Sequence, residues 1–543
     1  MSNAYFKVPD PVNEPVRAYQ AGSEEKKSLK AKLAQMAAEE IEIPLIIGGQ
    51  EIKTGNLVEM TAPHDHQLKL GRYHKAGAKE VKLAIETALE ARKSWADMPW
   101  EHRASIFIKA ASLLAGPWRD TLNAATMLGQ SKTVIQAEID SACEIIDFWR
   151  FNVYYMTQLM GNQPISSPGV WNRIEYRPLE GFVFAVTPFN FTSIAANLPT
   201  APAIVGNVVL WKPASSAVYS AYYVMRLLQE AGLPAGVINF VPGSGSQVGN
   251  PALASPDLAG IHFTGSTAVF QGMWKTVGET ITEKKYYPRI VGETGGKDFI
   301  FAHASSKLDE LVTAVIRGGF EYQGQKCSAA SRVYIPKSLW PAFKEKYVAE
   351  VGKIKMGSPE DFTNFMTAVI DRGAFDTIKE YIDYAHASPE AEILTGGGCD
   401  DSKGYFIEPT TIVTTNPKFK TMEEEIFGPV VTIFVYADEQ FDETVSLCDT
   451  TSPYALTGAI FAQDRHAIVQ MSNALRNAAG NFYINDKPTG AVVGQQPFGG
   501  GRASGTNDKA GSAMNMLRWM TVRAIKETML PPADWQYPFM NEA

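Results

Sequence analysis

Short apolar runs alternate with helix-length segments between residues 181 and 293, and this alternation most constrains how the chain can fold. The apolar runs, each of a length typical of a buried strand, are residues 182–186, 208–211, 237–241, 260–263 and 290–291. Helical segments are predicted between them at residues 217–231 and 269–280. Strands that alternate with helices form a parallel sheet covered on both faces. The pattern therefore predicts a doubly wound, Rossmann-like domain of the α/β class.

A second α/β series begins after Asp298, with helices at residues 308–318 and 339–351 around a strand at residues 332–335. It predicts a separate domain. Residues 163–180 are rich in Pro and Gly and then alternate between apolar and charged side chains, as a strand of a projecting hairpin does. We expect three parts: a first domain of residues 1–162 and 181–297, a second of residues 298–505, and a small β arm with a C-terminal flap, residues 163–180 and 506–543.

Two segments outside these series carry simpler patterns. Between residues 134 and 160 the apolar residues recur every three or four positions, which predicts one long amphipathic helix packed in the core. Residues 24–40 read as a solvated helix, and residues 41–47 as a short strand in which Pro44 suggests the edge of a sheet.

Composition narrows the class of partner. A chain of 543 residues that is 45% hydrophobic can bury several domain cores. Its net charge of −8 favours a small-molecule substrate over nucleic acid or an anionic membrane, because both of those attract clustered Lys and Arg. No apolar run approaches the length that spans a bilayer. The four cysteines form no CxxC pair and no zinc-type spacing, so neither a disulfide scaffold nor a bound metal is expected.

The beginning of the chain bears on its compartment. Glu14, Glu24 and Glu25 precede any Arg-rich helical face, which argues against a mitochondrial presequence that is still present. We expect a cytoplasmic protein if the source is bacterial, or a mitochondrial matrix protein without its presequence if the source is eukaryotic.

Cys327 is the first candidate for chemistry. A lone cysteine is usually a small buried apolar residue, but here Gln325, Lys326 and Ser328 make its surroundings polar. Lys326 would lower the pKa of the thiol and favour the thiolate, which is the nucleophilic form. Cys143, by contrast, lies within the predicted long helix.

Two further candidates follow apolar strands. Glu293 stands in Gly292-Glu293-Thr294-Gly295-Gly296, and Asn190 stands between Phe189 and Phe191. Each has a simpler interpretation, as a solvated turn residue and as an Asn that bonds its own turn. However, α/β sheets bind their ligands at the carboxyl ends of strands, where Asn190 stands.

Several motifs together resemble the aldehyde dehydrogenase superfamily, from about residue 45 to about residue 525. In chain order they are Pro188-Phe189-Asn190-Phe191, Trp211-Lys212-Pro213, Phe263-Thr264-Gly265-Ser266, Glu293-x-Gly295-Gly296-Lys297, Gly324-Gln325-x-Cys327 and Glu425-Ile426-Phe427-Gly428-Pro429. The resemblance implies an NAD(P)-dependent enzyme in which Cys327 attacks the aldehyde and Asn190 holds the oxyanion. Glu293 would then activate water against the thioester.

The resemblance also implies how the cofactor, NAD, is held. Lys212 and Glu425 would bind the riboses, Phe427 would pack by the nicotinamide and Thr187 would line the site. The phosphates would lie near Gly265, Ser266 and Thr267 at the start of a helix. Ser215 replaces a Glu found in many NAD-specific members, so NADP is not excluded. The stretch of residues 243–249 has GxGxxxG spacing after the third strand, unlike the usual fingerprint. The resemblance implies that it is mainly a turn near the adenosine, so it is not counted among the site residues.

Within the superfamily the resemblance is closest to the branch that oxidises L-glutamate γ-semialdehyde to glutamate, the second step of proline degradation. Residues 181–192, 318–329 and 481–500 carry it. No barrel-sized region for proline oxidation is present, so a monofunctional enzyme is expected. The implied substrate residues are Glu144 for the ammonium group, Ser328, Gly490 and Ala491 for the carboxylate, Lys326 beside them, and Phe191 and Phe498 as apolar walls. Ala491 stands where many relatives have Ser, which removes one side-chain hydrogen bond.

Two alternatives from other classes remain open. A thiol hydrolase would also use Cys327 and a base, but it usually pairs Cys with His and needs no dinucleotide domain. A binding protein on the same fold is possible, since fold does not determine function, but such a derivative is expected to lose Cys327 or Glu293.

The end of the chain predicts self-association. Residues 529–540 combine three prolines with several large apolar side chains, so this tail cannot be helical and was expected to lie against another surface. In the superfamily a hairpin arm and a C-terminal strand exchange between subunits, which implies a homodimer or a larger homo-oligomer.

Overall fold

The computed structural model describes residues 4–541, and its centre is a seven-stranded sheet in the order β11-β10-β7-β8-β9-β2-β3. Each of the five apolar runs forms one strand, and these five strands are mutually parallel, as expected. The bounds are β2 Leu45–Ile47, β3 Gln50–Ile52, β7 Phe182–Val186, β8 Val208–Lys212, β9 Ile238–Phe240, β10 Leu258–Thr264 and β11 Arg289–Glu293.

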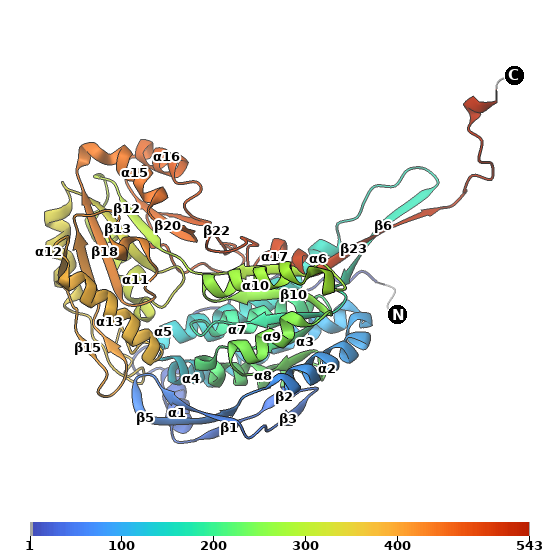
Figure 1. Ribbon diagram of the computed structural model, residues 1–543, viewed down its shortest axis with the longest axis horizontal. Helices are drawn as coiled ribbons and strands as arrows, with labels where there is room; N and C mark the ends of the chain where they lie inside the picture. The colour runs from blue at the N-terminus through green and yellow to red at the C-terminus, as the bar shows by residue number, and fades with distance from the viewer. Residues whose placement is uncertain (1–3, 542–543) are drawn as a thin grey trace.

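Helices cover both faces of this sheet (Figure 1). They are α2 Ala78–Asp97, α3 Trp100–Ala115, α4 Arg119–Gln130, α7 Thr192–Ile204, α8 Val218–Ala231, α9 Gly245–Ala254 and α10 Thr267–Glu279. The helices α8 and α10 confirm the two predicted ones. The helix α7 was not predicted, because it contains Pro199 and Pro202, which usually disfavour a helix interior.

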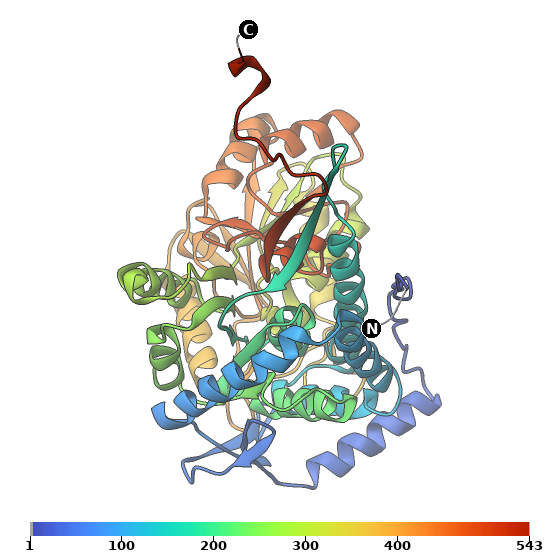
Figure 2. The same ribbon diagram turned by 90° about the vertical axis from the view of Figure 1, so that its right-hand side faces the viewer.

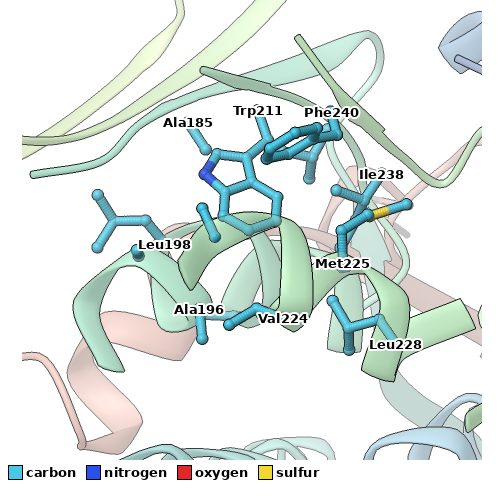
Figure 3. Packing of buried hydrophobic residues seen from close by; sticks show 14 of the residues in the cluster. Ala185, Ala196, Leu198, Trp211, Val224, Met225, Leu228, Ile238 and Phe240 are labelled. Carbon is cyan, nitrogen blue, oxygen red and sulfur yellow. The ribbon is translucent and has the colours of Figure 1, made fainter. Parts of the chain in front are cut away.

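Trp211 on β8 shows how the core is built (Figure 3). Its indole packs edge-on against Phe240 with ring centres 5.2 Å apart, above Met225 and Leu228 of α8. Its Nε1 donates to Oγ1 of Thr187 at 3.0 Å. Replacing such a buried Trp by Ala costs roughly 3–5 kcal/mol. The same side chain therefore stabilises the core and positions a loop at the carboxyl end of β7.

The second series after Asp298 forms a second seven-stranded sheet, in the order β14-β17-β18-β13-β12-β20-β21. All neighbours are parallel except β14 and β17. The strands are β12 Asp298–Ala302, β13 Ala330–Pro336, β14 Ala391–Thr395, β17 Thr410–Thr414, β18 Val430–Tyr436, β20 Thr457–Phe461 and β21 Asn481–Ile484. The main helices are α11 Leu308–Phe320, α12 Trp340–Val351, α13 Arg372–Ala387, α15 Phe441–Thr450 and α16 Arg465–Ala474. A buried apolar cluster lies on each face, so the expectation of a mixed α/β fold with parallel sheets is confirmed.

The segment of residues 134–160 is not one α-helix. A seven-residue π-helix, η1 Glu138–Glu144, separates α5 Val134–Ala137 from α6 Ile145–Met160. The assignment of Ile135 and Ile139 to the core was also wrong, because each is 41% exposed. Apolar periodicity identifies a stripe but does not say what covers it.

The N-terminal elements follow the expectation with one difference. The helix is α1 Glu24–Ala37. Pro44 divides the predicted strand into β1 Ile41–Ile43 and β2, which belong to different sheets. The strand β1 lies at the edge of a three-stranded sheet with β5 Asp65–His74 and β4 Leu57–Ala62.

The predicted arm is a two-stranded ribbon of β6 Val170–Pro178 and β23 Met520–Thr528, antiparallel over nine residue pairs. It projects from the body, and the tail after it extends farther out (Figures 1 and 2). In the tail Trp535 is 77% and Phe539 78% exposed, so within this chain the tail covers no surface of the body. The helix α17 Ala513–Arg518 contacts α6 of the first domain. We therefore propose that the arm proper begins at Met520.

None of the helices formed by residues 4–541 combines the length and the apolar composition needed to cross a membrane.

Candidate active site

Cys327 lies where two cavities meet. The larger cavity, about 800 Å³, is formed mainly by the first domain, and the smaller one, about 280 Å³, lies on the other side of the thiol. Cys327 lines both, together with Phe263 and Thr264 at the end of β10. The cysteine is 8% exposed, so a ligand in either cavity would meet a thiol that is nearly free of bulk water.

A tight turn presents this cysteine. Tyr322, Gln323 and Gly324 have consecutive positive φ angles of 50°, 56° and 65°. Gly324 is required, because a Cβ there would lie 2.1 Å from the carbonyl oxygen of Gly428. The Gln323 side chain donates to Oγ1 of Thr367 at 2.8 Å. Non-glycine residues in this region of backbone space are strained, and such strain concentrates at functional sites.

The surroundings of the thiol favour its protonated form. Burial, and then the negative charge of Glu293, raise the pKa of Cys327 well above its usual range. The expectation that Lys326 lowers this pKa is wrong: its ammonium donates to Oε2 of Glu321 at 3.1 Å and is neutralised there. Thiolate formation therefore requires a base that removes the proton.

Asn190 reaches the thiol from the first domain. It follows β7, and its Nδ2 donates to the carbonyl oxygen of Gln325 at 3.1 Å. An amide nitrogen carries two hydrogens, so this bond orients the group and leaves a second N–H for a ligand. Asn190 and Cys327 line the larger cavity together.

Glu293 ends β11 and lines the smaller cavity with Cys327. Burial raises the pKa of its carboxyl to about 8, an effect that Lys509 partly offsets. A carboxyl with a pKa near neutrality can both accept and release a proton under physiological conditions. Glu293 is therefore suited to the role of general base.

The larger cavity contains most of the predicted cofactor residues. Those that line it are Thr187, Lys212, Gly265, Ser266, Glu425 and Phe427. Thr267 does not line it; its hydroxyl donates to the carbonyl oxygen of Ala503 at 3.4 Å. Sequence reasoning missed Gly245, Ser246 and Gly249, which line the cavity at the start of α9. Their GxGxxxG spacing was the available signal and was set aside as atypical.

The chemistry of this cavity fits a dinucleotide. The N-termini of α9 and α10 both reach it, and free N–H groups there attract phosphates. Burial lowers the pKa of Lys212 to about 8. Glu425 accepts from the backbone N–H of Gly296 at 2.8 Å, and burial raises its pKa to about 7. Phe427, with φ of 60°, packs edge-on against Phe189 with ring centres 5.7 Å apart.

The smaller cavity contains all the predicted substrate residues, which are Glu144, Phe191, Lys326, Ser328, Gly490, Ala491 and Phe498. Oγ of Ser328 lies 2.8 Å from Oγ1 of Thr489. Glu144 accepts from the Ser193 hydroxyl at 2.9 Å, and burial, followed by the charge of Asp140, raises its pKa to about 8. The cavity thus offers a carboxyl group and hydroxyl groups.

The π-helix explains how Glu144 reaches this cavity. On an α-helical wheel Glu144 lies opposite Ile135 and Ile139, but all three side chains line the same cavity. In a π-helix each N–H bonds the carbonyl five residues back instead of four, so the turn through η1 is wider than that of an α-helix. The wider turn therefore rotates Glu144 toward the side that the isoleucines occupy.

Buried charges around the cavity were not predicted. Lys132 is fully buried and donates to Asp140 at 2.7 Å, with its ammonium 4.1 Å from the centre of the Phe191 ring. Asp140 also accepts from the backbone N–H groups of Thr192 and Ser193, so it caps α7. A single charged residue carries no sequence signal that shows whether it is buried or which residue it pairs with.

Among residues 4–541 no cluster of three or more His, Cys, Asp or Glu side chains could hold a metal ion.

Comparison with known proteins supports these observations. The model of the aldehyde dehydrogenase family matches residues 51–525. The delta-1-pyrroline-5-carboxylate dehydrogenase of Dictyostelium discoideum, labelled mitochondrial, is 54% identical over 98% of this chain and 96% of its own length. The Bos taurus protein of the same name is 49% identical over 97% and 94%. A crystal structure of the Delta-pyrroline-5-carboxylate dehydrogenase from Mycobacterium tuberculosis bound with NAD superposes with a TM-score of 0.97 at 50% identity, covering 100% of both chains.

Proposed function

The chain belongs to the aldehyde dehydrogenase family, and we propose that it catalyses the NAD-dependent oxidation of L-glutamate γ-semialdehyde to L-glutamate in proline degradation. One observation carries this function: Cys327 separates a dinucleotide-sized cavity from a small cavity with acidic and hydrogen-bond-donating groups. The relatives named for the same dehydrogenase, one of them bound with NAD, support it.

The proposed reaction begins with proton transfer. Glu293, as carboxylate, takes the Cys327 proton, and the sulfur adds to the aldehyde carbon to form a thiohemiacetal. The amide of Asn190 and the backbone N–H of Cys327 donate to the oxyanion. Lys212, Ser266 and Glu425 would hold NAD in the larger cavity, and the bound cofactor would supply the hydride acceptor for oxidation of this adduct to a thioester.

Hydrolysis completes the reaction. Glu293 first releases the proton that it took from Cys327 to solvent. As carboxylate it then removes a proton from water, which adds to the thioester carbon, and the Cys327 thiolate leaves and is reprotonated. Glutamate is the product. Because Glu293 has a pKa of about 8, the same carboxyl can take part in both proton transfers near neutral pH.

The charges of the smaller cavity favour an amino-acid aldehyde. The α-ammonium group would pair with Glu144, and the α-carboxylate would accept from Ser328 and the backbone N–H groups of Gly490 and Ala491. Phe191 and Phe498 would enclose the carbon chain. Lys326, which remains bonded to Glu321, would add a positive field to the carboxylate end.

We also propose a homodimer or a larger homo-oligomer built through the arm, and NADP as a second possible cofactor because Ser215 lines the larger cavity without a carboxylate. The protein would act in the mitochondrial matrix if its source is eukaryotic, as the labels of eukaryotic relatives suggest, and in the cytoplasm if it is bacterial.

Initial rates of cofactor reduction with three aldehydes test the function. We expect kcat/KM for L-glutamate γ-semialdehyde to exceed that for propanal and for succinate semialdehyde, because only the first substrate carries both α-charges. Cys327→Ala should give no turnover while it still binds NAD. Equal rates for propanal and the amino-acid aldehyde would refute the substrate assignment, and turnover by Cys327→Ala would refute the covalent route.

A further inference from the structure

Residues 12–19, here called the N-terminal strap, form neither helix nor strand and pass over the π-helix η1. The strap lies outside residues 51–525, where the family model matches. Whatever it contributes is therefore additional to the common framework of the family.

Buried ion pairs hold the strap in place. Glu14 accepts from Arg119 at 2.6 Å and from Arg150 at 2.9 Å. The backbone N–H of Arg17 and the hydroxyl of Tyr19 each donate to Glu138 at 2.8 Å. Because Arg119 and Glu138 are almost fully buried and also pair with each other, the strap is tied to the helix that carries Glu144.

Asn13 connects α6, the helix that follows η1, to the loop of residues 489–496. Its Nδ2 donates to Oδ2 of Asp147 on α6 and to the carbonyl oxygen of Val493, both at 2.8 Å. Its Oδ1 accepts from the Gln495 side chain at 2.9 Å. The same loop contains Gly490, whose backbone N–H faces the smaller cavity in the proposed function.

A close contact beside Asn13 reinforces this connection. A Cβ at Gly494, which has φ of 83°, would lie 2.1 Å from the Phe151 ring of α6. The loop therefore lies directly against α6, and the Asn13 amide hydrogen-bonds both the helix and the loop where they meet. Val16 of the strap lines the smaller cavity, as Val493 of the loop does.

We propose that the N-terminal strap is a specificity-determining wall of the substrate cavity and that Asn13 is a positioning residue. It holds the loop that carries the carboxylate-binding N–H groups at a set distance from Glu144. The inference rests on the proposed function, since only a substrate with two charges, such as an amino-acid aldehyde, is sensitive to that distance. A short uncharged aldehyde needs the thiol and the base alone.

Asn13→Ala tests the proposal in the full-length protein. We expect KM for L-glutamate γ-semialdehyde to rise about tenfold, equivalent to about 1.4 kcal/mol, with kcat within about twofold. L-Glutamate, tested as a competitive inhibitor, should bind about tenfold more weakly. For propanal, kcat/KM should stay within about twofold. Gln20→Ala, an exposed amide just outside the strap, is the matched control and should leave all four quantities unchanged.

A second variant checks that the effect of Asn13→Ala does not come from misfolding. Gln495→Ala removes a single bond to Asn13 from the loop side and should raise the same KM by about two- to fivefold. The double variant should be no worse than Asn13→Ala alone, because both act through one junction. Equal losses of kcat/KM for the two aldehydes, or a fall in kcat at constant KM, would mean that the strap only stabilises the fold and does not determine specificity. If the unmodified protein shows no preference over propanal, the proposed function itself fails.

Discussion

At Glu293 the requirements of catalysis and of stability oppose each other. The carboxyl ends a buried strand beside Cys327, and burial raises its pKa to about 8. The folded protein therefore favours the neutral acid, whereas the proposed hydrolysis needs the carboxylate. Activity that depends on this group should rise with pH, while its effect on stability should run in the opposite direction.

Glu293→Gln should impair both proton transfers that the carboxyl serves. We expect the burst of reduced cofactor to be slower, because thiolate formation loses its base, and the steady-state rate to fall by about 10²- to 10⁴-fold, the range for loss of a general base. The unmodified enzyme should gain kcat as pH rises from 6.5 to 9, with an apparent pKa near 8, and the variant should lose this profile. Stopped-flow absorbance and pH-rate measurements check both. A variant that keeps both the burst rate and the steady-state rate of the unmodified enzyme would argue against the base role.

The pH dependence of stability provides an independent test of the raised pKa of the Glu293 carboxyl. Its folded-state pKa lies above its usual value of 4.5, so its stabilising effect is complete below pH 4.5 and is lost as pH rises through about 8. The Tm of Glu293→Gln relative to the unmodified protein should therefore be higher at pH 9 than at pH 5.

Individual residues were predictable where their neighbours in sequence carried the signal. Polar flanks singled out Cys327, and a strand end singled out Asn190. The failure concerns Lys326, whose ammonium bonds Glu321 five residues away instead of acting on the adjacent thiol. Adjacency in sequence does not determine where a long side chain points, because that depends on the turn that precedes it.

The π-helix η1 is the element that sequence reasoning could not supply. Its residues keep an apolar spacing close to that of an α-helix, so the periodicity predicted an uninterrupted helix. The wider turn is stabilised by partners far along the chain, such as Tyr19 and Asn123, whose side chains both donate to Glu138. No local pattern encodes such partners.

The N-terminus of α7 depends on Asp140, which belongs to the π-helix η1. Asp140 caps α7 and pairs with Lys132, which has no access to water. Asp140→Asn should lower the unfolding free energy by about 3 kcal/mol, because breaking a buried ion pair leaves an uncompensated charge. Thermal unfolding should show a lower Tm than for Asp97→Asn, an exposed control at the end of α2. Equal Tm values for the two variants would mean that Lys132 is neutral in the folded protein.

At the scale of the whole molecule, the architecture was the most predictable feature. The apolar runs at β7, β8 and β10 predict buried parallel strands, and the α/β series after Asp298 predicts a second parallel sheet for the same reason. The destination of the tail was not predictable from one chain. Its aromatic side chains were expected to lie on a surface, and within this chain they do not, because the arm carries them away from the body.

The proposed dimer gives these side chains a function. Replacing both Trp535 and Phe539 by Ser should raise the dimer dissociation constant at least tenfold, since large aromatic residues dominate interface energies. Tyr287→Ser, which removes an equally exposed aromatic from the body, should not. Sedimentation velocity at micromolar concentration measures the effect. A double variant that associates as tightly as the unmodified protein would exclude the tail from the interface.

The meeting of two cavities at Cys327 has a consequence for the timing of the catalytic cycle. Because the dinucleotide and the aldehyde would occupy different spaces, neither has to leave before the other can enter or depart. Reduced cofactor can exchange while the acyl group is still attached to sulfur, and glutamate can diffuse away without displacing the nucleotide. Cys327 forms the boundary between the two cavities together with Phe263 and Thr264, and the order of events depends on the rates of two separate exits.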